Sequence, residues 1–149
     1  MSSKDKIKFE IKAKDKYSKN NPVVVNFSIQ NQSDEDIWVL SWHTPLEGIK
    51  GNILSIKCNG QEILYEGPMV KRGMPSKNDY IHIEPRGSVS RDVDLSKAYT
   101  LPSDEECSVE FDGKVYDLAA SGDILPKQAE EYETIHIPGN NIKFRISNE

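Results

Sequence analysis

The stretch Trp38–Tyr65, WVLSWHTPLEGIKGNILSIKCNGQEILY, carries the signals that decide the fold of this chain. Residues 37–42, which include its start, are nearly all apolar. They predict a strand that is covered on both faces or that reserves one face for a partner. The following residues, HTPLEGIKG, contain proline and glycine and predict a loop. Asn59-Gly60 then favours a two-residue hairpin turn, because both turn positions need a positive φ.

Period-2 alternation of apolar and polar residues continues through the rest of the chain. It predicts further strands at 7–13, 23–30, 80–83, 89–95, 107–111, 135–137 and 142–146. Asp112-Gly113 predicts a second hairpin, and Gly139-Asn140-Asn141 predicts a turn. Residues 95–106 and 128–131 each predict one helical turn, the first of which is stopped at Pro102. About eight strands at a spacing of about 8–12 residues, with no long amphipathic helix, indicate an all-β fold. We therefore expect one domain, residues 1–149, that forms an antiparallel immunoglobulin-like β-sandwich of about eight strands.

The inward positions of these strands predict the core. Six residues are expected in one core: Phe27, Trp38, Leu40, Val93, Val109 and Phe144. Trp38, Leu40 and Trp42 share one face of their strand, so alternation leaves open which tryptophan is fully buried. Cys58 and Cys107 form no CxxC motif and each lies within an apolar alternation. We expect two free thiols, packed as small apolar groups, rather than a disulfide.

Composition excludes several classes of partner and compartment. The chain has 149 residues and a formal net charge of -5, which argues against nucleic acid, since phosphates favour a basic surface. No run approaches the roughly 20 apolar residues of a membrane helix, and the first residues lack the apolar core of a signal peptide. The expected location is cytoplasmic for the sequence as given, or secreted if a leader is missing. Composition does not specify an oligomeric state.

The residue types that carry catalysis do not form a recognisable motif. His43, His82 and His136 belong to no HExxH sequence, and neither GxSxG nor GxxxxGK occurs. His82 and His136 each lie between two isoleucines, so on strands both face the polar side. We therefore expect no metal, no cofactor and no enzymatic activity.

Two loops are the candidate recognition sites. Lys71-Arg72 lies between the apolar pairs Met69-Val70 and Met74-Pro75, and a pair of cations in such a loop can form a recognition tip. The alternative is a solvated basic loop that packs its Met and Val side chains inward. The second loop supplies Thr44, Pro45, Leu46 and Glu47, if it lies at the same end of the sandwich.

Three segments resemble a known protein family. They are TPLEG (44–48), YEGPMVKRGMPSKNDYIHIEPRGSVSRDVDLSKAY (65–99) and NNIKFRI (140–146). They are similar to the non-catalytic N-terminal region of deuterolysin-type (aspzincin) zinc endopeptidases, above all the lysine-specific bacterial and fungal ones. The resemblance spans roughly Val23 to Ser147. The catalytic domain with its HExxH motif has no counterpart in this sequence, so the resemblance implies a stand-alone accessory domain.

This resemblance implies binding rather than proteolysis. We expect a non-enzymatic protein-binding module, either a protease-associated domain or a peptidase inhibitor that acts through its loops. The expected partner is a protein, in the first instance a peptidase. The alternative is a structural or adhesive β-sandwich with no link to proteases, since a fold does not specify a function.

Overall fold

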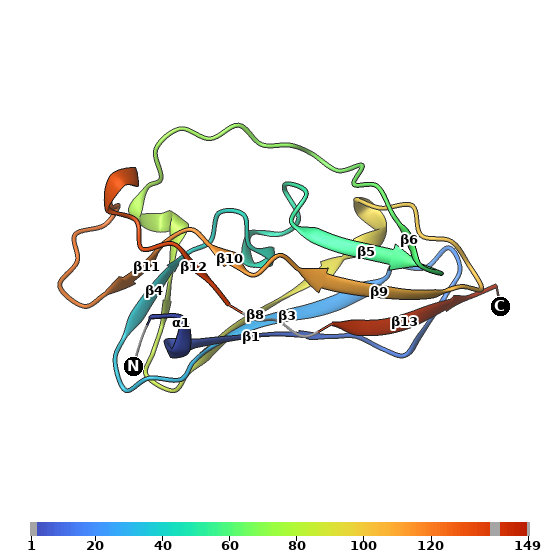
Figure 1. Cartoon of the computed structure of the whole chain (residues 1–149), viewed down its shortest axis with the longest axis horizontal. Helices are drawn as coiled ribbons and strands as arrows, with labels where there is room; N and C mark the ends of the chain where they lie inside the picture. Colours follow the sequence, from blue (N-terminus) through green and yellow to red (C-terminus); the bar gives the residue numbers. More distant parts are fainter. Residues whose placement is uncertain (1–2, 138–140, 149) are drawn as a thin grey trace.

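The computed structural model describes residues 3–137 and 141–148, and its regular secondary structure is mostly β-strand, joined by loops (Figure 1). The strands of four or more residues are β1 (Ile7–Lys12), β3 (Val24–Asn31), β4 (Ile37–Leu40), β5 (Leu54–Cys58), β7 (Tyr80–Ile83), β8 (Ser88–Asp94), β9 (Glu106–Phe111) and β13 (Ile142–Ser147). The shorter strands are β2 (Lys16–Ser18), β6 (Gln61–Glu62), β10 (Lys114–Val115), β11 (Leu118–Ala120) and β12 (Ile135–His136). The helical elements are α1 (Ser3–Lys6) and the 3₁₀ turns η1 (Pro45–Glu47), η2 (Lys77–Asp79), η3 (Leu95–Lys97) and η4 (Ala129–Glu131).

The all-β prediction is confirmed, and so are the two predicted helical turns, which correspond to η3 and η4. The turn predicted at Gly139 and Asn140 lies outside the described residues.

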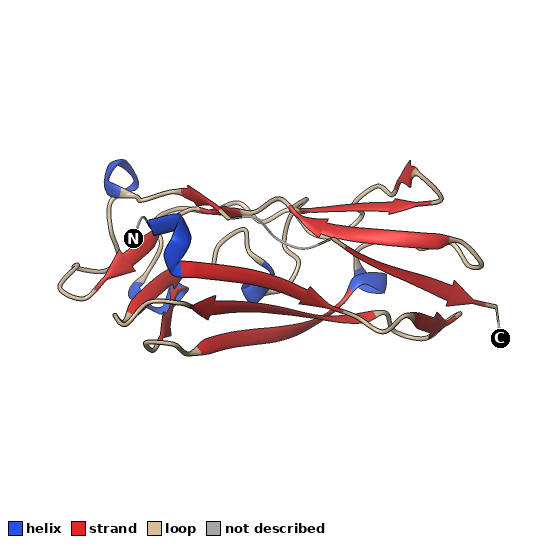
Figure 2. Cartoon of the chain, turned by 60° about the horizontal axis from the view of Figure 1, so that its bottom comes forward, coloured by secondary structure: helices blue, strands red, loops and turns tan. Residues whose placement is uncertain are grey.

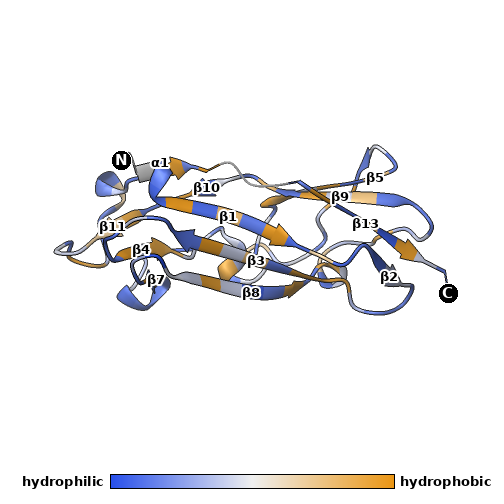
Figure 3. Ribbon diagram, turned by 90° about the horizontal axis from the view of Figure 1, so that it is seen from below, coloured by the Kyte–Doolittle hydropathy of each residue, from blue (hydrophilic) through white to orange (hydrophobic). Residues whose placement is uncertain are grey.

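Two sheets face each other and form the sandwich (Figure 2). One has the strand order β1-β3-β8, and the other has the order β2-β13-β9-β5-β6. The neighbours pair antiparallel except β13 and β2, which pair parallel, because the chain crosses to the second sheet after β1. Burial alternates along β1 and β3, as Figure 3 shows in the alternating hydropathy of β1. The rings of Phe9 (β1) and Phe111 (β9), 4.5 Å apart between centroids, pack across the two layers.

A third sheet, β11-β4-β7, divides the apolar residues into two clusters. Phe27, Val93, Val109 and Phe144 lie in the main core, as predicted. The prediction was wrong for the aromatic strand. Leu40 belongs to a second cluster with Tyr80 and Ala119, and Trp38 and Trp42 pack against that cluster while only partly buried. Ile37 and Val39 face the main core, so β4 is covered on both faces.

The two Gly-containing turn signals have different outcomes. Asn59 and Gly60 have φ values of 50° and 80° and close the β5–β6 hairpin, as predicted. Asp112-Gly113 does not close a hairpin, because β9 pairs with β5 and β13 whereas β10 pairs with β12. Gly113 (φ 80°) accepts a hydrogen bond from the Ile137 N–H at 2.8 Å, and a Cβ there would overlap the Ile137 carbonyl oxygen. Glycine is required here for a close approach of two backbones.

The expectation of two free thiols is contradicted. Cys58 and Cys107 form a disulfide, and both residues are buried. The reason is the β5–β9 register, which places the two cysteines directly opposite each other with a Cα–Cα distance of 4.0 Å. Each sequence environment taken alone gives no sign of this register.

Candidate functional site

The TPLEG loop is a capped, buried turn. The Thr44 hydroxyl donates to the Ser41 carbonyl at 2.7 Å and accepts from the Leu46 N–H at 3.3 Å, so it caps η1. Gly48 ends η1 with φ 87°, a conformation that favours glycine. Thr44, Pro45 and Leu46 are buried. Their side chains therefore hold the loop in place. They are not exposed at the surface, where the predicted recognition edge would need them.

A long segment, residues 63–79, crosses from β6 to β7 and arches over one side of the molecule (Figure 1). It contains no strand and only the short turn η2 at its end. Backbone bonds at Ile63 and Asp79 hold its two ends. Between them, the Glu66 N–H donates to the Ala98 carbonyl at 2.8 Å, and the Val70 N–H donates to the Lys50 carbonyl at 3.4 Å. The Tyr65 ring also packs on another aromatic ring, that of Tyr99.

Arg72 joins the long segment to η1. Its guanidinium donates to both carboxylate oxygens of Glu47 and lies 4.8 Å from the centroid of the Trp42 ring. Glu47 Oε2 also accepts from the His43 N–H at 2.7 Å. The two candidate loops are therefore in contact, which the sequence-based prediction had made a condition of a shared site. Arg72 forms this contact and its side chain is mostly buried, whereas Lys71 remains exposed.

Several exposed side chains of the long segment are apolar, and Lys71, Glu66, Ser76, Lys77 and Asn78 are exposed on it as well. Leu64, Met69, Val70 and Met74 are exposed by 76%, 81%, 43% and 62%. We call these four side chains together with Lys71 the loop surface. The alternative prediction, that Met69 and Val70 pack inward beneath solvated charges, does not describe this structure.

His43, which precedes the TPLEG loop, has a positive φ of 61°. Such a backbone conformation is uncommon for residues other than glycine. Its ring lies on that of Tyr116, with centroids 4.7 Å apart. Burial lowers the pKa of His43, and the nearby Arg72 cation lowers it further, although Glu47 acts in the opposite direction. At the end of the segment, the Ser76 N–H donates to Asp79 at 2.7 Å and lowers the pKa of that carboxyl.

A buried ion pair that the sequence analysis did not single out supports the second apolar cluster. Asp117 is fully buried, and its carboxylate accepts from Lys127 Nζ at 3.0 Å, from the Tyr80 hydroxyl at 2.7 Å and from the Glu133 N–H at 2.9 Å. Burial raises the pKa of Tyr80, as does its bond to Asp117. A single Asp between Tyr116 and Leu118 is not a recognisable motif, so the sequence alone does not indicate this ion pair.

The histidines do not converge on a metal site in the described part of the chain, where no group of three potential ligands occurs. His82 Nε2 lies 2.8 Å from Asp36 Oδ1, and its ring stacks on Trp38 with centroids 4.7 Å apart. His82 and His136 are both exposed, as their place on the polar faces predicted.

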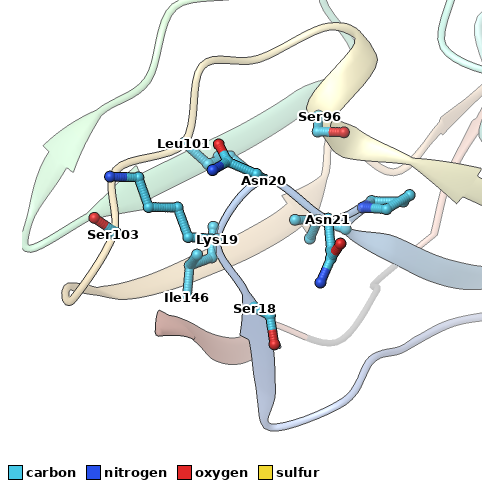
Figure 4. Close-up of a pocket in the computed structure, with 10 residues that line it drawn as sticks. Ser18, Lys19, Asn20, Asn21, Ser96, Leu101, Ser103 and Ile146 are labelled. Atoms are coloured by element: carbon cyan, nitrogen blue, oxygen red, sulfur yellow. The ribbon is translucent and has the colours of Figure 1, made fainter. Parts of the chain in front are cut away.

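Two cavities lie away from the loop surface. One, of about 350 Å³, lies beside the loop that follows β2, and Figure 4 shows Lys19, Asn20 and Ser103 around it. Its lining residues supply hydroxyl and amide groups and one cation, but no carboxylate or imidazole. The other, of about 420 Å³, is lined by Trp38 and Lys77 among others. Neither brings together an acid and a base in a way that indicates catalysis. None of the helices among residues 3–137 and 141–148 is long and apolar enough to cross a membrane.

Comparison with known proteins agrees with the fold. A region of 89 residues, 60% of this chain, is 25% identical to a protein named "Extracellular protease" from Aeromonas hydrophila. The match spans only about a quarter of that protein's length, 25%. This supports similarity to part of a protease, while the deuterolysin type stays a prediction. The model of the immunoglobulin-like domain family matches residues 7–139, which is most of the sequence. The chain therefore belongs to the immunoglobulin-like domain family.

Proposed function

We propose that this domain is a non-enzymatic protein-binding module that docks on a peptidase and inhibits it through the loop surface. The observation that carries the proposal is the exposure of Leu64, Met69, Val70 and Met74 beside Lys71 on one long segment. Exposed apolar side chains along one segment, flanked by polar ones, are a feature of protein interaction sites. The similarity to part of an extracellular protease supports a peptidase as the class of partner.

The attachment of the long segment favours binding. Lys71 lies between two fixed points, the Val70 N–H bonded to the Lys50 carbonyl and the Arg72 side chain paired with Glu47. Because the segment is held before association, less conformational entropy is lost when it binds. The exposed Lys71 ammonium suits an acidic specificity pocket, where a buried carboxylate forms a strong charge-assisted bond. The apolar side chains around it would then cover the rim of that pocket.

The test is an inhibition titration with a direct binding assay, run against a panel of purified peptidases that includes lysine-specific metallopeptidases. We expect the wild-type domain to inhibit at least one of them with saturation. Met69→Ser combined with Met74→Ser, and separately Lys71→Ala, should weaken inhibition by about tenfold or more, the effect of losing about 1.4 kcal/mol in a hot spot. Unchanged inhibition by both variants would exclude the loop surface.

Ile124→Ser is the matched control, because Ile124 is an exposed apolar residue (88%) in another loop. It should inhibit as the wild type does. If no peptidase in the panel is bound, the proposal fails. The domain is then better described as a structural sandwich that shares only the fold.

A further inference from the structure

The outer edge of β8 is a row of unpaired backbone groups. β8 is the last strand of the sheet β1-β3-β8, and Figure 3 shows it at the margin of that sheet. Its register with β3 is continuous over seven residue pairs, with no bulge. Among the described residues, no backbone group outside β3 bonds to the main chain of β8. An edge strand of this length is a template for another strand.

The ends of the β3–β8 ladder show which groups face outward. The Asn31 N–H donates to the Gly87 carbonyl at 2.8 Å, and the Leu95 N–H donates to the Val23 carbonyl at 2.9 Å. In an antiparallel pair, alternate residues direct their N–H and C=O groups to the partner. Positions 89, 91 and 93 therefore bond to β3. The main-chain groups of 88, 90, 92 and 94 point to the free edge.

A cavity of about 330 Å³ runs beside this edge. Residues 91–94 line it on the β8 side, and Gly48, Ile49 and Pro68 are also among its lining residues. The cavity therefore offers room beside a strand edge whose donors and acceptors are unused. An extended polypeptide is the occupant that satisfies such a row, because its own groups repeat with the same spacing.

Arg91 specifies the charge of that occupant. It is paired with the inward-facing Phe27 and lies between Val89 and Val93, so it is on the inner face of β8. Its guanidinium has five N–H donors, and its one bond within the described residues is to the Leu46 carbonyl at 3.2 Å. A carboxylate on the inner face of an added strand could take the remaining donors.

The outer face of β8 has the opposite preference, because Asp92 lies there. Its carboxylate accepts from Asn26 at 2.9 Å. An acidic side chain on the outer face of the added strand would be repelled. A second copy of this chain is disfavoured as the occupant, because the inner-face residues of its β8 would be Val89, Arg91 and Val93, which bring no carboxylate.

We propose that the free edge of β8 binds an extended segment of a partner protein as an added strand, with an acidic side chain of that segment held by Arg91. None of the loop-surface residues is among those that line the cavity beside this edge. The test of this site therefore succeeds or fails independently of peptidase inhibition.

The experiment uses the full chain, labelled with ¹⁵N, and synthetic seven-residue peptides of alternating Thr and Val whose central residue is Glu, Gln or Lys. We expect the Glu peptide to bind with saturation and to shift the amide signals of Ser88, Ser90 and Asp92. The Gln peptide should bind at least about fivefold more weakly, because a charge-assisted bond is lost. The Lys peptide should bind least.

Two pairs of variants separate the backbone from the charge. Ser90→Pro removes an outward N–H without touching the β3 ladder and should abolish binding, whereas Ser90→Ala should bind normally. Arg91→Gln should erase the preference for Glu over Gln, and Arg91→Lys should restore part of it. Thermal unfolding confirms that each variant is folded, and Met69→Ser with Met74→Ser should leave peptide binding unchanged.

Three kinds of result would overturn the inference. The first is no saturation by any peptide at millimolar concentration. The second is a set of shifted amides outside β8, or equal affinity for the Glu and Gln peptides. The third is a dimeric free protein whose Ser90 and Asp92 amides are already protected from exchange, which would assign the edge to a second copy.

Discussion

Arg72 and Glu47 form an ion pair that closes the contact between the two loops in which the sequence predicted a binding site. Both side chains are nearly buried, with exposures of 14% and 9%. The neighbouring cations Lys71 and Arg72 therefore have different roles. Arg72 fixes the long segment, and Lys71 is the one presented to solvent. A combined change of both residues would confuse loss of binding with loss of the loop's position.

Glu47→Gln should lower the free energy of unfolding by about 2 to 3 kcal/mol, because it leaves the Arg72 guanidinium nearly buried without its counter-charge. Urea denaturation at pH 7 measures this. Lys71→Ala is the control and should change stability by no more than about 0.5 kcal/mol, as is usual for an exposed residue. Equal effects of the two substitutions would show that the ion pair does not hold the loops in solution.

His43 should make stability depend on pH below neutrality. Its pKa in the folded state lies below the ordinary value of 6.5, because burial and then the Arg72 cation disfavour the charged ring. The unfolded chain therefore binds more protons than the folded one at mildly acidic pH. The contribution of His43 to the free energy of unfolding is constant above about pH 7. It decreases as the pH drops from 6.5 toward the folded-state pKa.

The measurement for His43 is the urea midpoint at pH 7.5 and 5.5. Asn is tolerated at the positive φ of this position, so His43→Asn should fold and should lose less stability between the two pH values than the wild type. His136→Asn changes an exposed histidine and should retain the wild-type dependence. A slope that His43→Asn leaves intact would place its origin elsewhere.

Lys127 should be important for the second apolar cluster. Lys127→Met leaves the fully buried Asp117 without its cation, so the free energy of unfolding should fall by about 3 kcal/mol. Lys143→Met is the comparison, because Lys143 pairs with Glu106 at 3.7 Å while both side chains are mostly exposed. Its effect should stay within about 0.5 kcal/mol. Chemical denaturation of both variants decides, and similar losses would contradict the expectation.

Local patterns in the sequence predicted the parts of this fold that depend on neighbouring residues. Alternation placed β1 and β3 correctly, and Asn59-Gly60 gave the β5–β6 hairpin, because a turn and a strand face are properties of a few adjacent residues. Asp112-Gly113 carries the same dipeptide signal, but the chain changes sheets there. Pairing with β12, about 20 residues later in the sequence, overrides the local preference.

The candidate site was predicted in part for the same reason. The sequence identified both loops, and the structure brings them together through Arg72 and Glu47. It did not show that Thr44, Pro45 and Leu46 are buried, because burial depends on the packing of η1 against β3 and β8, which lie far away in sequence. The sequence also did not show that Arg72 and Lys71 have different roles. Two adjacent cations are equivalent in sequence, and only the fold pairs Arg72 with Glu47, 25 residues away.

The cysteine pair leads to the last prediction, which replaces the expectation of free thiols. Protein alkylated during purification without reductant should show no thiol when titrated in denaturant, because Cys58 and Cys107 form a disulfide between β5 and β9. Cys58→Ala combined with Cys107→Ala should lower the free energy of unfolding by about 2 to 4 kcal/mol, since the unfolded chain loses a cross-link between residues 49 apart in sequence. Reduced wild-type protein is the control and should match the double variant.

Such a bond persists in oxidising compartments, so the yield of oxidised protein should be higher after export than after cytosolic expression. Two thiols titrating in exported protein would show that the cysteines lie opposite each other without bonding.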